Sequence, residues 1–247
     1  MVEGKTRAEI DRLTGHDPKK PAPSMRPVDA ATLLLLDREG SDWRVLMGKR
    51  HMRHAFMPGK FVFPGGRADK HDGDIAAASE LRETDTARLR AGMGAKPSNR
   101  RARALAVCAI RETHEETGLL IGAAGERTPS HPDWTDFAGR GLAPALAPLR
   151  YVARAVTPPG RTRRFDTRFF AAMADSIAHS LPEFPSGELE SLQWLTFDEA
   201  LAIEAPPITH TVIALVRDRL ASDPKLEGDM PVPGYFMRHG KFVRDMV

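Results

Sequence analysis

The segment of this chain with the clearest chemistry is RETHEETG, at residues 111–118. On an α-helix, Glu112, Glu115 and Glu116 would project from one face, because residues three and four apart are neighbours on the helix surface. Three carboxylates at this spacing repel one another, and a hard divalent cation with oxygen ligands removes that penalty. Arg111 lies four residues before Glu115 and could hold that carboxylate in position. The run predicts a metal-binding helix; the alternative is an ordinary solvated face rich in glutamate.

A glycine turn, FPGG at residues 63–66, precedes this helix in the sequence. Glycines leave room for a phosphate group to come close to the backbone. The two motifs, in this order, resemble the box of the Nudix hydrolase family, which reads G, five residues, E, seven residues, R-E-U-x-E-E-x-G-U, where U is apolar. Gly66 matches the first glycine of the box. The second half is matched by Arg111, Glu112, Glu115, Glu116, Gly118 and Leu119.

The match to the box has departures. Arg111 follows Gly66 by 45 positions, whereas the box places the two 14 positions apart, so 31 residues are inserted. Counting back from Arg111 places the first glutamate of the box at Arg103, so that acid is expected to be missing, and Thr113 stands at an apolar position. Because the insert enters beside the metal helix, we expect it to contribute to substrate choice or dimerisation.

An insert inside the box resembles the branch of the family that contains the peroxisomal coenzyme A diphosphatases. The segments MPGKFVFPGGRAD, RFDTRFF and PPITHTVIAL are similar to that branch, and with the box they extend the similarity over roughly residues 28–220. The coenzyme A signature that precedes the glycine turn is matched in part. Arg50 and Gly59 are in place, but Ala55 stands where that signature has arginine.

The resemblance implies roles for the residues of the box. Glu112 and Glu116 would be the main ligands of a Mg²⁺ or Mn²⁺ ion. Glu115 would be a further ligand or a catalytic group, and the backbone carbonyl near Gly65 would also contact the metal. Arg111 would be the catalytic-site arginine that orients the glutamates.

Residues outside the box are candidates for the general base and for substrate binding. The family often takes its base from a later loop, where Glu188 and Glu190 lie; each could equally be an exposed loop glutamate. The candidates for binding substrate phosphates are Gly66, Arg50, Arg53, Arg163 and Arg164. The arginines among them could instead be solvated surface charges.

The implied function is metal-dependent hydrolysis of the diphosphate linkage of a nucleoside diphosphate joined to another group. Coenzyme A or acyl-coenzyme A ranks first as the substrate, followed by ADP-ribose, NADH and dinucleoside polyphosphates. Two alternatives stay open. The altered first half of the box would suit a non-catalytic, nucleotide-binding sensor, and the basic charge balance would suit an RNA-processing pyrophosphohydrolase.

Composition limits the class of protein. The 247 residues are 41% hydrophobic and 28% charged, which suits one domain with a substantial core. The longest apolar run, Ala30–Leu36, is too short to cross a bilayer. Cys108 is the single cysteine, and we find no secretory segment, so a cytoplasmic protein is expected. The net charge of +3 suits a small phosphate-bearing substrate; no nucleic-acid module is recognised, and a homodimer is left open.

The expected fold is α/β (α+β): a Nudix α/β/α sandwich in which helices flank a mixed sheet. It would form a single domain at residues 28–247, after a flexible leader at 1–27, with inserts at about 67–98 and 122–148. The first insert has helical composition at 74–92. Strands are predicted at 31–36, 43–47, 60–64, 119–121, 151–156, 168–173 and 189–195, with a final strand in the tail. Helices are predicted at 98–117, 197–203 and 208–220.

Overall fold

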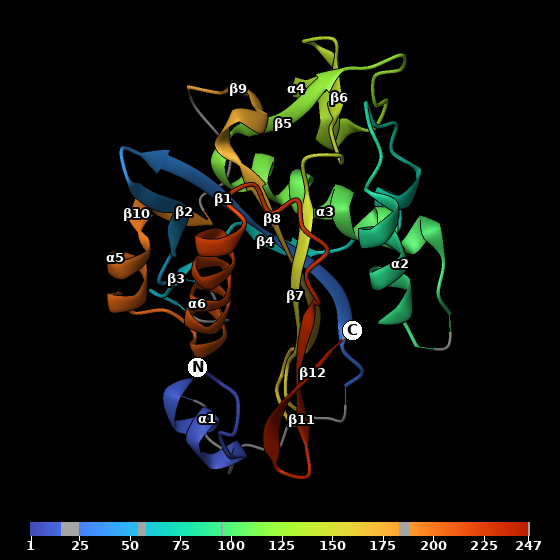
Figure 1. Cartoon of the computed structure of the whole chain (residues 1–247). Coiled ribbons are helices and arrows are strands. Elements are labelled where there is room, and N and C mark those ends of the chain that lie inside the picture. The colour runs from blue at the N-terminus through green and yellow to red at the C-terminus, as the bar shows by residue number, and fades with distance from the viewer. Residues whose placement is uncertain (16–24, 54–57, 95, 183–187, 247) are drawn as a thin grey trace.

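A mixed sheet of nine strands runs through the centre of the computed structural model, which describes residues 1–15, 25–53, 58–94, 96–182 and 188–246 (Figure 1). The strands are β1 (Val28–Glu39), β2 (Asp42–Arg50), β3 (Phe61–Val62), β4 (Gly65–Arg67), β7 (Arg150–Val156), β8 (Phe165–Met173), β10 (Leu189–Thr196), β11 (Pro233–Arg238) and β12 (Lys241–Met246). The main path is β10-β2-β1-β8-β7-β11-β12, with β3 beside β2 and β4 beside β1. β1 runs parallel to β8, which makes the sheet mixed.

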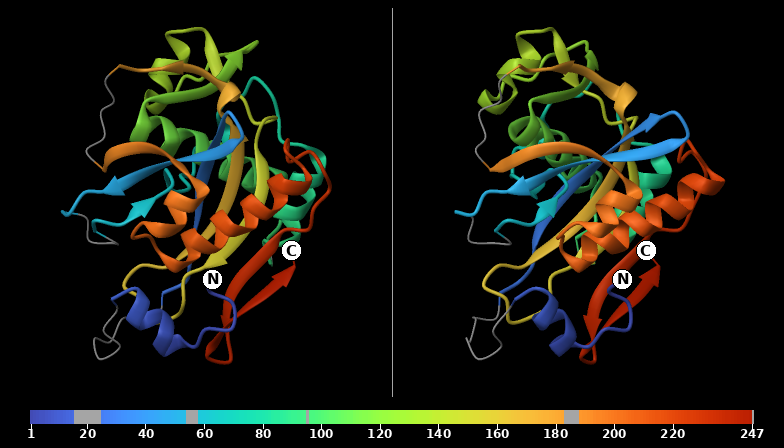
Figure 2. Two further views of the ribbon diagram at one scale, coloured as in Figure 1. Left: turned by 60° about the vertical axis from the view of Figure 1, so that its left-hand side comes forward. Right: turned by 90° about the vertical axis from the view of Figure 1, so that its left-hand side faces the viewer.

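Helices cover both faces of this sheet (Figures 1 and 2). The helices are α2 (Glu83–Ala91) and α3 (Asn99–Thr117) on one face, and α5 (Phe197–Ala202) and α6 (Pro207–Ser222) on the other. β1 shows why both faces need a cover, since side chains alternate along a strand. Leu33 and Leu35 belong to the core under α3, whereas Leu34 and Leu36 belong to the core under α6, and all four are fully buried. The α/β/α sandwich predicted from the sequence is confirmed.

The helix that carries the three glutamates has defined ends. Ser98 caps its N-terminus, where the side chain accepts a hydrogen bond from the backbone of Arg101. Gly118 ends it in the left-handed conformation, with φ 70°, which glycine adopts at low cost. The helix predicted at 98–117 is therefore confirmed.

A second, smaller sheet lies above the C-terminal end of α3. It pairs β5 (Leu119–Ala124) with β6 (Leu142–Pro144) and with β9 (Ile177–Ser180). Residues 122–148, expected to be irregular with one or two helical turns, contain β6, a 3₁₀ turn at Pro132–Trp134 and α4 (Thr135–Ala138). Trp134 and Phe137 are buried there with ring centroids 4.9 Å apart and belong to the core under α3, so this excursion packs on the main domain.

The described part of the leader is folded, unlike the flexible segment that we expected. Residues 7–13 form α1 (Arg7–Leu13), which begins with a capping box at Thr6. Val2 and Ile10 are buried, and the backbone amide of Val2 donates to Thr211 of α6. Figure 1 shows α1 next to the β11–β12 hairpin. Burial of Val2 and Ile10 stabilises the packing of this segment on the domain. The polar composition of the leader did not predict this packing.

Two further expectations differ from the structure in detail. The strand predicted at 60–64 is only two residues long, and Gly65 and Gly66, expected to end it, begin β4 instead. The tail forms a hairpin of β11 and β12 rather than one strand. The hairpin predicted at 31–36 and 43–47, the strand pair at 151–156 and 168–173, and the helix at 208–220 are confirmed.

Candidate active site

The C-terminal half of α3 lies directly against the glycine turn. β4 pairs antiparallel with β1, which places Gly65 opposite Thr32. A carboxylate oxygen of Glu116 accepts a hydrogen bond of 2.9 Å from the backbone amide of Gly65. A Cβ at Gly66 would lie 2.3 Å from a carboxylate oxygen of Glu112, so only glycine lets that carboxylate stand over the backbone. The structure therefore brings together the two halves of the motif, which are 45 residues apart.

Arg111 holds two of the three glutamates. Its Nη1 donates to Glu112 at 2.8 Å and to Glu115 at 3.2 Å. Its Nε and Nη2 donate to the two carboxylate oxygens of Asp72, at 2.9 and 3.2 Å. Burial alone would lower the pKa of Arg111, but the hydrogen bond with Asp72 and the charge of Glu112 raise it overall. The guanidinium thus stays charged and is fixed at both ends, as a group that positions Glu112 and Glu115 requires.

Asp72 supplies the acid that we expected to be missing. Arg103, where counting back from Arg111 placed the first box glutamate, pairs instead with Glu80 of the insert. Asp72 is six positions after Gly66, as the first glutamate of the box would be, and it is 2% exposed. The insert therefore begins after Asp72 and separates this acid from Arg111. Counting forward from Gly66, instead of back from Arg111, would have found this residue.

Burial perturbs the two glutamates beside the glycine turn. It raises the pKa of Glu112 to about 7; Arg111 opposes this rise and Glu115 adds to it. It raises the pKa of Glu116 to about 8, against the hydrogen bond from Gly65 and with a contribution from Glu112. Two neighbouring carboxylates that resist ionisation need either protons or a cation. Glu115 is more exposed, with 37% of its side chain accessible.

This donor set fits a hard divalent cation in its chemistry. Its oxygen atoms belong to carboxylates and to backbone, which Mg²⁺ and Mn²⁺ prefer over softer metals. Within the described ranges, no three acidic, histidine or cysteine side chains already converge as a complete set of metal ligands. Glu112, Glu116 and Asp72 carry three carboxylates when ionised, and Arg111 is the one arginine bonded within this group. The group therefore leaves negative charge for a cation to balance.

The later acids lie at the edge formed by β2 and β10. Leu189 pairs with Arg50 in this ladder. Nη2 of Arg50 is 3.6 Å from a carboxylate oxygen of Glu188, and Nε2 of His51 is 3.0 Å from Glu190. The charge of Arg50 lowers the pKa of Glu116 and that of Glu188 raises it, so both groups lie near this carboxylate. Arg50 and Glu188 therefore border the same site, whereas Glu190 is turned to His51.

The remaining arginines lie elsewhere. Arg53 is exposed, and its backbone amide donates to the ring of His51. Arg164 donates to the backbone carbonyls of Thr157 and Met25, near the start of β1, and its neighbour Arg163 is exposed. The structure does not bring Arg163 or Arg164 to the glutamates. Ala55, the departure from the coenzyme A signature, lies outside the described residues.

The sandwich fold and the glutamate helix against a glycine turn define a hydrolase of the Nudix type, and comparison with known proteins agrees. A model of the NUDIX domain matches residues 101–216, beginning after the inserted segment. The crystal structure of a NUDIX hydrolase from Alicyclobacillus acidocaldarius is similar with a TM-score of 0.60 and 30% sequence identity, over 78% of this chain and 92% of that chain. The chain belongs to the Nudix hydrolase family and is an enzyme.

A curated relative gives a finer likeness over a shorter stretch. Acyl-coenzyme A diphosphatase NUDT19 from Gallus gallus is 34% identical over 126 residues, which are 42% of this chain and 30% of the relative. The match therefore spans less than a third of that relative's length.

In the described part of the chain, no helix is both long and apolar enough to cross a bilayer.

Proposed function

We propose that this enzyme hydrolyses a diphosphate linkage with the help of Mg²⁺ or Mn²⁺ held by Glu112 and Glu116. Glu115 completes the set as a further ligand or through a water molecule, and the carbonyl near Gly65 is an additional contact. The observation that carries the proposal is the placement of Glu112 and Glu116 against Gly66 and Gly65. Glu116 is 3% exposed and the Glu112 side chain 16% exposed, and both have raised pKa values that a cation would reverse. The bound cation would neutralise charge on the phosphoryl oxygens and lower the pKa of a water molecule.

The chain's own residues position the reaction. Arg111, fixed by Asp72, donates to both Glu112 and Glu115, and its positive charge offsets the repulsion between these two carboxylates. Gly66 has no side chain to obstruct a phosphate group above the turn. At the opposite border, Arg50 supplies positive charge for a second phosphate. Glu188, beside Arg50 and close to Glu116, is our candidate to accept a proton from the attacking water.

We infer that the leaving group belongs to coenzyme A or an acyl-coenzyme A. The likeness to an acyl-coenzyme A diphosphatase supports this choice, as do Arg50 and Gly59 of the coenzyme A signature. ADP-ribose, NADH and dinucleoside polyphosphates rank next, because they contain the same diphosphate linkage. Roles for Glu190, Arg53 and Arg164, a homodimer, and a cytoplasmic location stay predictions.

A hydrolysis screen tests the proposal. The full-length enzyme with Mg²⁺ or Mn²⁺ is incubated with coenzyme A, acetyl-coenzyme A, ADP-ribose, NADH and a diadenosine polyphosphate, and the products are identified by mass spectrometry. We expect cleavage between the two phosphorus atoms, fastest for coenzyme A or its thioester. Tight binding of one of these compounds without turnover would replace the proposal with the nucleotide-sensor alternative.

A further inference from the structure

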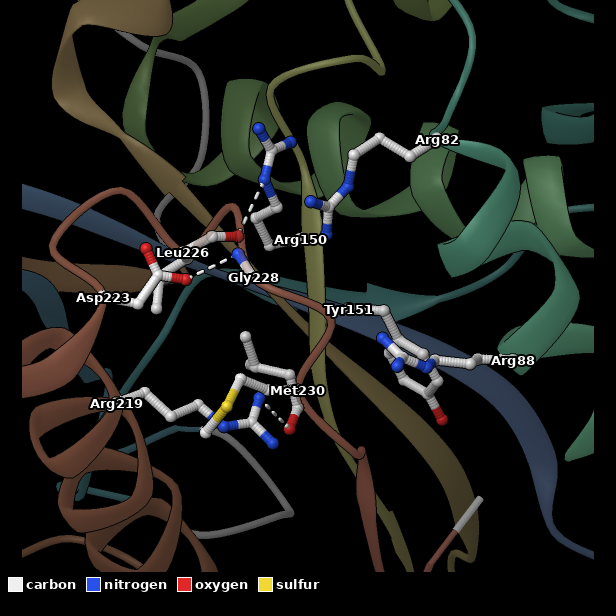
Figure 3. Close-up of a pocket in the computed structure, with 10 residues that line it drawn as sticks. Arg82, Arg88, Arg150, Tyr151, Arg219, Asp223, Leu226, Gly228 and Met230 are labelled. Atoms are coloured by element: carbon white, nitrogen blue, oxygen red, sulfur yellow. Dashed lines mark hydrogen bonds between the residues drawn. The ribbon is translucent and has the colours of Figure 1, made fainter.

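A pocket lined by four arginines lies beside β7, away from the β2–β10 edge of the sheet (Figure 3). Arg82 and Arg88 come from the inserted segment, Arg150 begins β7, and Arg219 lies near the end of α6. The strand order places β1 and β8 between β7 and the β2–β10 edge. The space open to the centre of a water-sized sphere is about 20 Å³, far below the usual range for a drug-sized ligand, so only a small group would fit.

Two of these arginines have no acidic partner. Arg150 donates to the backbone carbonyls of Leu226, Ala147 and Leu149. Arg219, which is 6% exposed, donates to the carbonyl of Val152 and to that of Pro231. Neither forms an ion pair with a carboxylate in the part of the chain that the structure describes. Backbone carbonyls satisfy the donors of a guanidinium but do not cancel its charge.

The other two arginines are paired at the rim. Arg82 binds Asp85, which also accepts from a backbone amide, and Arg88 binds Asp229. Figure 3 shows the guanidinium groups of Arg82 and Arg150 close together on one side of the pocket and Arg219 beside Met230 on another. Four arginines and one acid, Asp223, line the pocket, while Asp85 and Asp229 pair with Arg82 and Arg88 beside it.

The electrostatics agree with this geometry. Burial lowers the pKa of Arg219 to about 10, and the charges of Arg244 and Arg88 add to the effect. Burial also lowers the pKa of Arg150; the charge of Arg82 lowers it further, while the acids Asp85, Glu227 and Asp223 oppose the shift. An anion in the pocket would relieve both arginines.

The backbone around the pocket is held in an uncommon conformation. Leu226 has φ 53°, a left-handed value that is rare for a bulky side chain, and its carbonyl accepts from Nε of Arg150. The Leu226 side chain is 6% exposed, so packing fixes the turn. Asp223 accepts from the backbone of Gly228 and closes the same loop. The loop that borders the pocket is thus held by packing of Leu226 and by the hydrogen bond to Asp223.

We propose that this four-arginine pocket is an anion-binding site, separate from the catalytic glutamates, that takes a single phosphate group. Guanidinium groups match the oxygens of phosphate in geometry and charge. The group is either inorganic phosphate or the phosphate monoester end of a small molecule. Since Arg88 comes from the insert and Arg219 from α6, a bound phosphate would link the insert to α6.

The test is calorimetric titration of the full-length enzyme, with Mg²⁺ present and ionic strength held constant. One arm uses inorganic phosphate and the other uses AMP, a phosphate monoester. The variants are Arg88→Gln and Arg150→Gln, which remove charge from two different elements, so the test survives if one of them fails to fold. Arg217→Gln is the control, because Arg217 lies on α6 but pairs with Asp198 at the surface.

We expect saturable binding in the wild-type enzyme, weakened about tenfold in Arg88→Gln and Arg150→Gln and unchanged in Arg217→Gln. The arm with the tighter binding identifies the source of the phosphate. Absence of saturable binding in both arms would overturn the proposal. So would binding that Arg50→Gln weakens while Arg88→Gln and Arg150→Gln leave it unchanged, because the anion would then lie at the catalytic site.

Discussion

At the scale of single residues, the proposed chemistry depends on two carboxylates, Glu112 and Glu116, that fold into an unfavourable environment. Glu116 loses nearly all and Glu112 most of its water contact when α3 packs on the glycine turn, and burial raises the pKa of both. A protein retains such groups where they serve a function, because each makes the metal-free fold less stable at neutral pH. A bound cation reverses this effect, so the cost of burial becomes affinity for the metal.

The pH dependence of stability tests this view. A carboxyl whose folded-state pKa is raised holds its proton longer in the folded state, so stability falls as pH rises from the ordinary value of 4.5 towards about 8. Glu116→Gln has no proton to lose at this position. In chelator, we expect this variant to become more stable relative to wild type between pH 5.5 and pH 8, as measured by thermal melting. A difference in melting temperature that stays constant over this range would contradict the raised pKa.

Metal affinity should depend on pH in the opposite direction. A proton must leave the carboxylates before the cation binds, so the apparent affinity should rise about tenfold per pH unit for each proton released, up to about pH 7–8. Titration of Mn²⁺ into the enzyme at pH 6 and pH 7.5 would measure this. Equal affinity at both values would mean that the cation does not displace those protons.

At the scale of elements, Asp72 and the insert that follows it hold the helix that carries the glutamates. Asp72 precedes the inserted stretch and fixes Arg111 in a buried pair, whose side chains are 2% and 8% exposed. Arg103 and Arg101 then fasten the N-terminal half of α3, to Glu80 of the insert and to Asp29 of β1. The helix is therefore held along its length, which keeps its glutamates in register with the glycine turn.

Removal of the charge at Asp72 should be costly. In Asp72→Asn the buried guanidinium of Arg111 would lose the most buried of its three carboxylate partners, and we expect a loss of about 3 kcal/mol in the free energy of unfolding. Urea denaturation measures the change. The control is Asp74→Asn from the same turn, because Asp74 pairs with Arg100 at the surface and should leave stability unchanged. Equal effects of the two substitutions would show that Arg111 does not depend on Asp72.

The elements near the site differed in how far the sequence predicted them. The ends of α3 were predictable because Ser98 and Gly118 are local signals at the positions where a cap is needed. The ion pair of Asp72 with Arg111 was not predicted, because an insert hid the spacing that links them. The short strand β4 was also missed, since Gly65 and Gly66 favour a turn and only pairing with β1 makes them a strand.

At the scale of the whole molecule, pairings between distant segments set the architecture. The parallel contact of β1 with β8 joins residues 137 positions apart, such as Thr32 and Phe169. Apolar runs predicted both strands, but no local pattern specifies that these two pair with each other. The packing of the N-terminal segment follows the same rule: the helix signals of α1 are local, whereas Val2, which precedes it, donates a hydrogen bond to Thr211 of α6.

The N-terminal helix should contribute to global stability. Ile10 is 4% exposed within the core under α6, so Ile10→Ala should cost about 3 kcal/mol. Leu13 lies on the same helix but is 51% exposed, so Leu13→Ala is the control and should have little effect. Thermal melting of both variants compares them. If Ile10→Ala has the same melting temperature as the wild-type enzyme, α1 does not stabilise the domain.

The most direct test of the catalytic claim is the rate of the proposed coenzyme A cleavage by Glu116→Gln, compared with wild type and with Glu126→Gln, an exposed control that follows β5. We predict that Glu116→Gln, which keeps the shape of the side chain but removes its charge, loses about 10³-fold in kcat with Mg²⁺. The control should retain the wild-type rate, and excess chelator should stop the wild-type reaction. Undiminished cleavage by Glu116→Gln, or by wild type in chelator, would contradict the account.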